Sequence, residues 1–72
     1  MTPEIAQEVS TLLLDISQRL DDSLAQVHDK CSAEDFERYR KAVGKIMGEI
    51  LVEGLNPLYA EHPALKPPGW YP

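Results

Sequence analysis

Residues 27–39, VHDKCSAEDFERY, contain the end of one predicted helix and the start of another. Ser32 is a favoured N-cap, because its hydroxyl can accept a hydrogen bond from a backbone N–H two or three residues later. Glu34 and Asp35 follow in the first turn, where the positive end of the helix dipole favours acidic side chains. A connection this short makes the two helices antiparallel, so the sequence predicts an αα-hairpin.

Upstream of this turn, apolar residues recur every three or four positions and predict an amphipathic helix over residues 3–30. Thr2 is a favoured N-cap, and Pro3 suits the first helical position, where the N–H that it lacks would have no intrahelical partner. The apolar positions are Ile5, Val9, Leu12, Leu13, Ile16, Leu20, Leu24 and Val27. At about 100° per residue they lie within an arc of roughly 120°, which leaves one side of the helix in water.

Downstream of the turn, the same spacing predicts a second helix over residues 33–54. We expect Gly54, with Asn56-Pro57 beyond it, to end this helix. Gly44 and Gly48 lie one turn apart beside the apolar face, and we expect them to allow close approach of another helix or of the tail rather than of a ligand. The apolar face covers roughly half of the circumference, and it consists of Phe36, Tyr39, Val43, Ile46, Met47, Ile50, Leu51 and Leu55.

Residues 56–72 differ in character from the hairpin, which we assign to residues 1–55. Pro57 suits the first position of a short helical turn. An extended tail follows, set by Pro63, Pro67, Pro68 and Pro72. The tail carries Trp70, the one tryptophan of the chain, and next to it Tyr71. Because disordered segments rarely contain such apolar side chains, we expect the tail to pack on the hairpin or on a partner.

The length of the chain favours self-association. A domain of about this size buries only about 60% of the surface that its unfolded chain exposes. With 72 residues and a single cysteine, the chain has no intrachain disulfide to compensate. The apolar face of the second helix is wider than one neighbouring helix can cover. We therefore expect a homodimer in which two hairpins form a four-helix bundle.

The charges are unevenly distributed along the chain, whose formal net charge is −5. Residues 1–35 carry eight acids and two bases, a net −6, whereas residues 36–72 carry four acids and five bases, a net +1. In an antiparallel hairpin the end of the first helix lies beside the start of the second. We therefore expect ion pairs between two groups of side chains, namely Asp15, Asp21, Asp22 and Asp29 with Arg38, Arg40, Lys41 and Lys45.

This composition also excludes several classes of partner. An acidic chain repels a polyphosphate backbone, so we expect no nucleic-acid partner. No apolar run approaches the roughly 18 residues that cross a bilayer, so we expect no membrane partner. We therefore interpret the chain as a cytoplasmic protein of bacterial type.

No group of residues matches a catalytic or cofactor site. His28 and Cys31 have the spacing of two metal ligands on one helical turn, and His62 is the other strong candidate, but this set is incomplete for zinc. A cysteine nucleophile also needs a positioned base and an enclosed site, and no glycine-rich phosphate loop is present. We therefore predict no enzymatic activity, no metal and no cofactor.

The best-supported function is a small non-enzymatic protein-interaction module, such as an adaptor, regulator or inhibitor of another protein. It would act through the broad apolar face of the second helix and the aromatic tail, with the candidate interface residues Phe36, Tyr39, Arg40, Val43, Met47, Leu51, Trp70 and Tyr71. Two alternatives stay open. One is a helical bundle that binds a small ligand or metal near His28 and Cys31. The other is a DNA-linked regulator that uses Arg38, Arg40, Lys41 and Lys45.

Three residues depart from the pattern of their helices. Arg40 lies inside the apolar arc of the second helix, where it could extend its charged end into water, anchor an interface, or pair with Asp21 or Asp22. Leu14 and Val52 lie away from the main apolar stripes, and we interpret them as ordinary exposed apolar residues.

Overall fold

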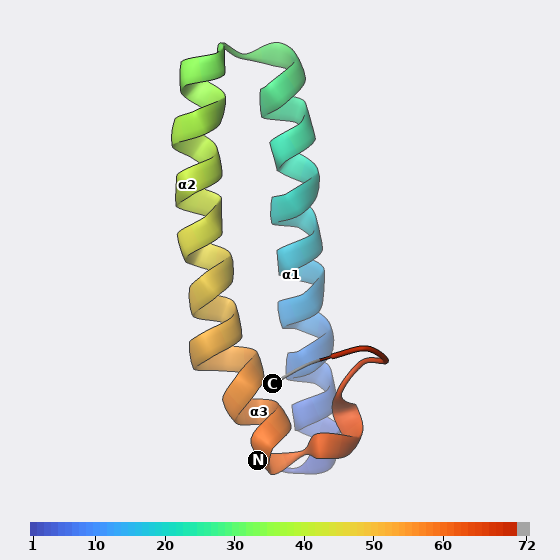
Figure 1. Ribbon diagram of the computed structural model, residues 1–72. Helices are drawn as coiled ribbons and strands as arrows, with labels where there is room; N and C mark the ends of the chain where they lie inside the picture. Colours follow the sequence, from blue (N-terminus) through green and yellow to red (C-terminus); the bar gives the residue numbers. More distant parts are fainter. Residues whose placement is uncertain (71–72) are drawn as a thin grey trace.

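The computed structural model describes residues 1–70, which form a long helical hairpin followed by a short return segment (Figure 1). The elements are α1 (Pro3–Lys30), α2 (Ala33–Glu49), the π-helical segment η1 (Ile50–Leu55), α3 (Asn56–Glu61) and the 3-10 turn η2 (Pro63–Leu65). α1 and α2 lie side by side and antiparallel, so the extents of the molecule are 44 × 21 × 16 Å. The predicted all-helical class is confirmed, and residues 1–70 contain no strand.

Both long helices begin at the caps that the sequence indicates. The Thr2 hydroxyl accepts a hydrogen bond of 3.3 Å from the Ile5 N–H, and Pro3 follows at the first helical position. The Ser32 hydroxyl accepts a hydrogen bond of 3.1 Å from the Asp35 N–H. Such caps satisfy backbone donors that have no partner within the helix, and each stabilises it by about 1 kcal/mol.

The second helix does not end at Gly54, and that prediction is wrong. Helical backbone continues through η1 and α3 as far as Glu61. Within η1 the turn widens, and the Asn56 N–H bonds to the carbonyl of Leu51, five residues earlier. Pro57 explains the wide turn, because its ring has no N–H to donate and would clash with the carbonyl four residues earlier in a regular α-helix. The helix therefore bends at η1 instead of stopping, and α3 turns toward the foot of α1 (Figure 1).

The core lies at this bent end, where α1 meets η1 and α3. Ala6, Leu55, Leu58 and Tyr59 are buried there together, and the buried Ser10 hydroxyl lies 2.7 Å from the Tyr59 hydroxyl. Six partly buried side chains surround them, namely Val9, Leu13, Leu14, Ile50, Leu65 and Trp70. The hydrophobic core is thus concentrated at one end of a long molecule.

Fewer side chains hold the other half of the hairpin together. Val43 is the one buried residue of α2. Closer to the turn, the Tyr39 hydroxyl lies 2.7 Å from the Ser23 hydroxyl. The rings of His28 and Phe36 meet edge to face with centroids 5.0 Å apart.

Of the three glycines in this arm, Gly54 is the one that lies close to α1, and Gly44 and Gly48 do not. A Cβ atom at Gly54 would lie 2.9 Å from Leu13 Cδ1. A Cβ atom at Gly44 or Gly48 would meet no atom of residues 1–70 within 4 Å. Within one chain, the prediction that these two glycines admit another helix or the tail is therefore wrong, and both lie beside open space.

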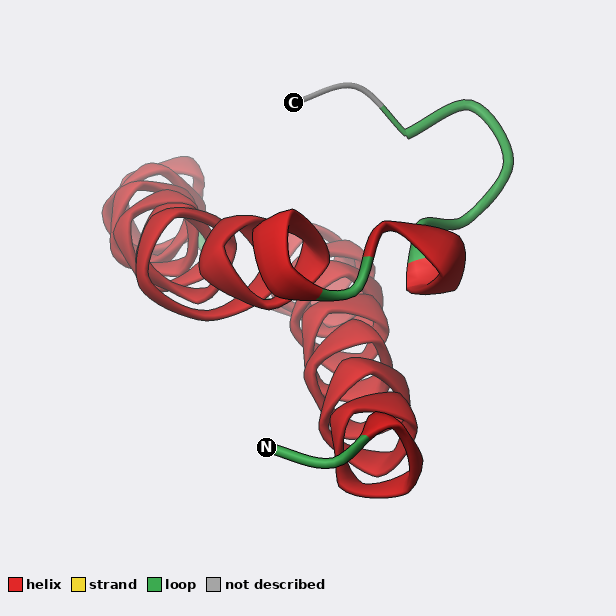
Figure 2. Cartoon of the chain, turned by 90° about the horizontal axis from the view of Figure 1, so that it is seen from below, coloured by secondary structure: helices red, strands yellow, loops and turns green. Residues whose placement is uncertain are grey.

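The return segment leaves α3 at His62 and curves back beside the hairpin (Figure 2). It is less extended than its prolines predict, because Pro63–Leu65 form a 3-10 turn. Gly69 then adopts a φ of 80°, a left-handed conformation that L side chains rarely adopt. This turn brings Trp70 back to the core, and both Trp70 and Leu65 pack against the buried cluster.

The expected ion pairs between α1 and α2 do not form within residues 1–70, and this prediction is wrong. Arg19 pairs with Asp15 at 3.2 Å, one turn earlier on α1. Arg40 pairs with Glu37 on α2. Apolar packing and the two hydroxyl pairs therefore join the arms, and charge does not. No helix in residues 1–70 has the length and apolar character that a membrane span requires.

Candidate functional site

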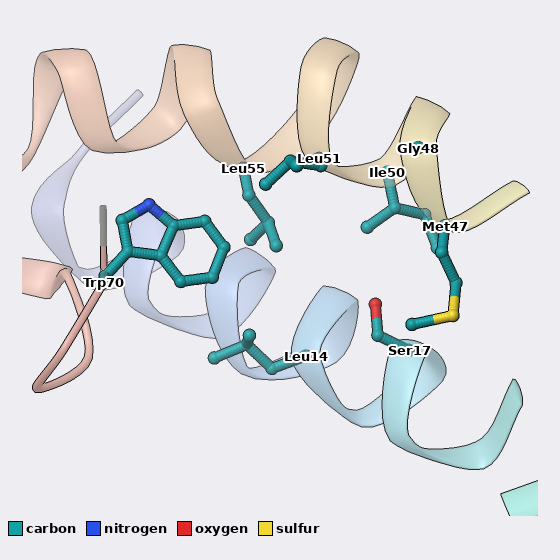
Figure 3. Close-up of a pocket in the computed structure, with 8 residues that line it drawn as sticks. All are labelled: Leu14, Ser17, Met47, Gly48, Ile50, Leu51, Leu55 and Trp70. Atoms are coloured by element: carbon teal, nitrogen blue, oxygen red, sulfur yellow. The ribbon is translucent and has the colours of Figure 1, made fainter. Parts of the chain in front are cut away.

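The strongest candidate for a binding site is an apolar pocket on one side of the hairpin, with a volume of about 310 Å³ (Figure 3). Its walls come from α1, the end of α2, η1 and the return segment. The lining residues are Leu14, Ser17, Met47, Gly48, Ile50, Leu51, Leu55 and Trp70. We call this pocket the Trp70 groove.

The bend at η1 positions one wall of the groove. Leu55 is buried at its base, whereas Leu51 is 39% exposed at its rim. Gly48 lies on the same wall, and a Cβ atom there would meet nothing within 4 Å in residues 1–70. The absence of a side chain at Gly48 therefore keeps this part of the rim open.

Trp70 closes one end of the groove. Its ring meets the Tyr59 ring edge to face, with centroids 5.1 Å apart and an interplanar angle of 80°. Its backbone N–H donates a hydrogen bond of 3.1 Å to the Pro67 carbonyl, across the turn that contains Gly69. Figure 3 shows the six-membered ring of Trp70 directed into the pocket. The return segment thus supplies a wall of the site.

The chemistry of the groove is almost entirely apolar. Ser17 is its one polar side chain, and the Ser17 hydroxyl donates a hydrogen bond of 2.9 Å to the Leu13 carbonyl of its own helix. No charged side chain lines the groove. A polar ligand would lose its hydration here without gaining partners, so the groove suits an aliphatic or aromatic group.

The structure brings together three of the predicted interface residues, Met47, Leu51 and Trp70, which all line the groove. Three others lie between the two arms. Val43 is 1% exposed, the Tyr39 hydroxyl pairs with Ser23, and the Phe36 ring packs against His28. Tyr71 lies outside the described residues.

Arg40 is separate from the groove. Its guanidinium is exposed and binds the Glu37 carboxylate one turn earlier. This hydrogen bond lowers the pKa of Glu37 from its ordinary value and raises that of Arg40. A pair between Arg40 and Asp21 or Asp22 does not form within residues 1–70, so Arg40 does not fix the register of the arms through those acids.

The residues considered as metal ligands are dispersed. His28 is exposed near the hairpin turn, with Nδ1 3.4 Å from an Asp29 carboxylate oxygen. Cys31 is also exposed. His62 follows α3 at the opposite end of the hairpin. In the described part of the chain, no three His, Cys, Asp or Glu residues are gathered as metal ligands would be.

The basic residues form a stripe on α2. Arg38, Lys41 and Lys45 are all exposed, and at about 100° per residue they lie within an arc of about 60°. On the same helical wheel Arg40 lies between about 100° and about 160° from the three residues of this stripe. The basic cluster therefore consists of three exposed cations on one side of α2 and of Arg40, which is paired with Glu37.

Several groove residues were not predicted from the sequence. Its position away from the main stripe predicts that Leu14 is an ordinary exposed residue, yet Leu14 lines the groove. The one sign of this role in the sequence is that Leu14 lies away from the main apolar stripe of its helix. That position can be interpreted only when Trp70 is known to fold back beside it. No family model, curated protein or solved structure matches this chain, so its role has to be inferred from its own geometry.

Proposed function

We propose that this chain is a small, non-enzymatic protein-interaction module that binds an apolar helical segment of another protein in the Trp70 groove. It would act as an adaptor, regulator or inhibitor of that protein. The observation that carries the proposal is the groove itself, an open apolar pocket with no charged side chain and a single satisfied hydroxyl.

The form of the groove favours a helix over a small substrate. Its two long walls are antiparallel helices, and lining residues recur along them at helical spacing, as in Leu14 with Ser17 and Met47 with Leu51. An amphipathic helix can lay side chains at positions i, i+3 and i+4 into such a groove. Gly44 and Gly48 leave open space on the adjacent surface of α2, so a partner backbone can approach closely.

Self-association is the second part of the proposal, as a cytoplasmic homodimer in which two hairpins form a four-helix bundle. It is supported by the concentration of the core at one end of the hairpin and by the number of large apolar side chains that stay exposed. A soluble monomer rarely keeps a contiguous apolar patch uncovered.

Site-specific photocrosslinking in the cells that make the protein tests the interaction. A photoreactive residue at Leu51, on the rim of the groove, should form a crosslink to a second protein. The same residue at Gln26, exposed on α1 beyond the groove, is the matched control and should not form this crosslink. Crosslinks of equal yield at both positions, or none at Leu51, would contradict the proposal.

A further inference from the structure

We propose that the face of the hairpin opposite the Trp70 groove is a second docking surface, which binds a basic amphipathic helix of another protein. We call this face the acidic seam. The inference goes beyond the proposed function, because the acidic seam and the Trp70 groove have no residue in common. The seam consists of the apolar residues Ile5, Val9, Leu12 and Ile16 of α1 with the carboxylates of Glu53 in η1 and Glu61 in α3.

The apolar part of the seam is a strip along α1. Its four residues follow one another at spacings of four, three and four, which places them on one side of the helix. Ile5 is 48% exposed, Leu12 is 55% exposed and Ile16 is 37% exposed. On a helical wheel Leu12 lies about 160° from the groove residue Leu14, so the strip and the groove lie on different sides of α1. Apolar residues grouped in this way mark an interaction surface, whereas scattered ones do not.

A pocket of about 270 Å³ joins this strip to the opposite arm. Val9 belongs to both the strip and the pocket, and the apolar side chains of Leu13 and Leu58 also line the pocket. Glu53 and Glu61 line the same pocket, and both are exposed. An apolar side chain of a partner can therefore enter beside two carboxylates. The Trp70 groove differs in this respect, because no charged side chain lines it.

The end of the hairpin that contains the core is acidic as a whole. Residues 3–18 and 46–65 form this end, and they include no Lys or Arg. Within residues 1–70, the Asp15–Arg19 pair is the one ion pair that joins an acid of this end to a Lys or Arg side chain. The amino terminus adds at most one positive charge here. The acids of this end are Glu4, Glu8, Asp15, Glu49, Glu53 and Glu61.

Carboxylates border the apolar strip on both sides. On the helical wheel Glu8 lies about 40° from Leu12, on the side of the strip away from the opposite arm. Glu53 and Glu61 border the strip on the side of the opposite arm, across the pocket. The next base along the chain, Lys66, lines a different pocket together with Trp70 and does not neutralise this border.

This border identifies the charge of the occupant. Complementary charge accelerates encounter and like charge repels, so an acidic rim around an apolar strip favours a basic partner. Nucleic acids and anionic membranes carry the wrong sign. A second copy does not fit either, because the arm beside the strip carries Glu53 and Glu61, and a two-fold axis in either direction brings carboxylates together. The self-association proposed above would therefore use a different surface.

The form of the seam favours a helix as the partner segment. The strip spans about 16 Å, which corresponds to three turns of a helix laid along it. Residues 1–70 contain no strand edge to which an extended peptide could add. The apolar stripe of an amphipathic helix would cover Leu12 and enter the pocket beside Val9. Lys or Arg residues on its two flanks would then reach Glu8 on one side and Glu53 on the other.

Fluorescence anisotropy with a labelled synthetic peptide tests the seam on the full chain. The probe is a helix of leucine and lysine about 14 residues long, with leucines at positions i, i+3, i+4 and i+7. We expect it to bind, and to bind more weakly as salt is added. One control peptide has glutamate in place of every lysine, and a second has the same composition in scrambled order. Each should bind at least about tenfold more weakly than the probe.

Charge variants determine where the lysines bind. Glu53→Gln combined with Glu61→Gln should weaken binding of the probe about threefold to tenfold. Asp21→Asn combined with Glu34→Gln is the matched control, because it removes the same charge from exposed positions outside the core end. This control should weaken binding less than about twofold.

Apolar variants determine where the leucines bind. Leu12→Gln should weaken binding about fivefold or more, whereas Leu51→Gln, on the rim of the Trp70 groove, should leave it unchanged. Far-UV circular dichroism checks that each variant folds, and Ile5→Gln replaces Leu12→Gln if that variant does not. Because Trp70 lines the groove and not the seam, its fluorescence emission should not shift when the probe binds.

Several results would overturn the inference. Equal binding of the scrambled peptide, or equal weakening by the two pairs of charge variants, would show attraction by net charge alone. A shift in Trp70 emission with weakening by Leu51→Gln would place the probe in the groove instead. A dimer of the chain alone that Leu12→Gln weakens and Leu51→Gln does not, measured by sedimentation equilibrium, would assign the face to a second copy. The crosslink from Leu51 is measured separately, so failure of the seam is distinguishable from failure of the groove.

Discussion

The hydroxyl of Tyr59 lies 2.7 Å from the hydroxyl of Ser10, which is 49 residues earlier in the chain, and both side chains are buried. This contact joins the first third of α1 to α3. The ring of Tyr59 also supports Trp70 at the end of the groove. One side chain thus connects the hairpin, the bend and the return segment.

Tyr59→Phe should lower the free energy of unfolding by about 1–3 kcal/mol, because it leaves the Ser10 hydroxyl buried with no other hydrogen bond from residues 1–70. Tyr39→Phe should cost less, since Ser23 keeps its hydrogen bond of 2.6 Å to the Leu20 carbonyl. Urea denaturation at one protein concentration measures both. Equal losses in the two variants would show that the Ser10 hydroxyl finds another partner.

Gly44→Ala should raise the free energy of unfolding by about 0.5–1 kcal/mol, because alanine favours helix and nothing in residues 1–70 lies within 4 Å of the new Cβ atom. Gly54→Ala should give a smaller gain or a loss, since Leu13 must move away from a Cβ atom 2.9 Å from its Cδ1. The urea midpoints of the two variants make the comparison. A larger gain at Gly54 would mean that Leu13 moves without cost.

Gly69→Ala should release Trp70 from the groove. The φ of 80° at Gly69 is unfavourable for alanine by about 1–2 kcal/mol, so the turn before Trp70 would open. Because the chain has one tryptophan, its fluorescence emission reports this directly and should shift to longer wavelength. Gly44→Ala is the control and should leave the emission unchanged. An unshifted spectrum in Gly69→Ala would show that packing against Tyr59 holds the ring without the turn.

The pair between Glu37 and Arg40 has a defined pH dependence. Because the hydrogen bond from Arg40 lowers the pKa of Glu37 in the folded chain, its stabilising effect is present above the ordinary glutamate pKa. That effect is lost as the pH falls through the lowered value. In Arg40→Gln, an NMR titration should show the pKa of Glu37 returning toward its ordinary value. Since both groups are exposed, we expect no measurable change in thermal stability at neutral pH.

The sequence was sufficient for features that local chemistry determines. Ser32 and Thr2 act through N–H groups three residues away, so their caps could be predicted without any knowledge of packing. Gly54 misled the prediction because a glycine after an apolar run usually ends a helix, whereas here it admits Leu13. A π turn before Pro57 then lets the helix continue into α3, where Leu58 and Tyr59 are buried.

The groove could be predicted only in part, because its walls are far apart in the sequence. Met47 and Leu51 belong to an amphipathic pattern that predicts an apolar surface. Leu14 lines the groove only because Trp70, which is 56 residues later in the sequence, returns to lie beside it. The predicted ion pairs between the helices failed for a related reason, since Asp15 and Arg40 each find a partner of opposite charge one turn away on their own helices.

The position of the core determines which part of the molecule opens first. Backbone amides exchange with water at a rate that follows the local free energy of opening, and buried apolar contacts raise that free energy. Those contacts gather around Ala6, Leu55 and Leu58, whereas the arms near Ser32 are joined by half-buried side chains. We therefore expect amides of residues 33–41 to exchange well before those of residues 55–59. We expect the hairpin to open first at its covalent turn, while the end where α1 begins and α3 packs stays closed. This is the reverse of what the connectivity alone would predict.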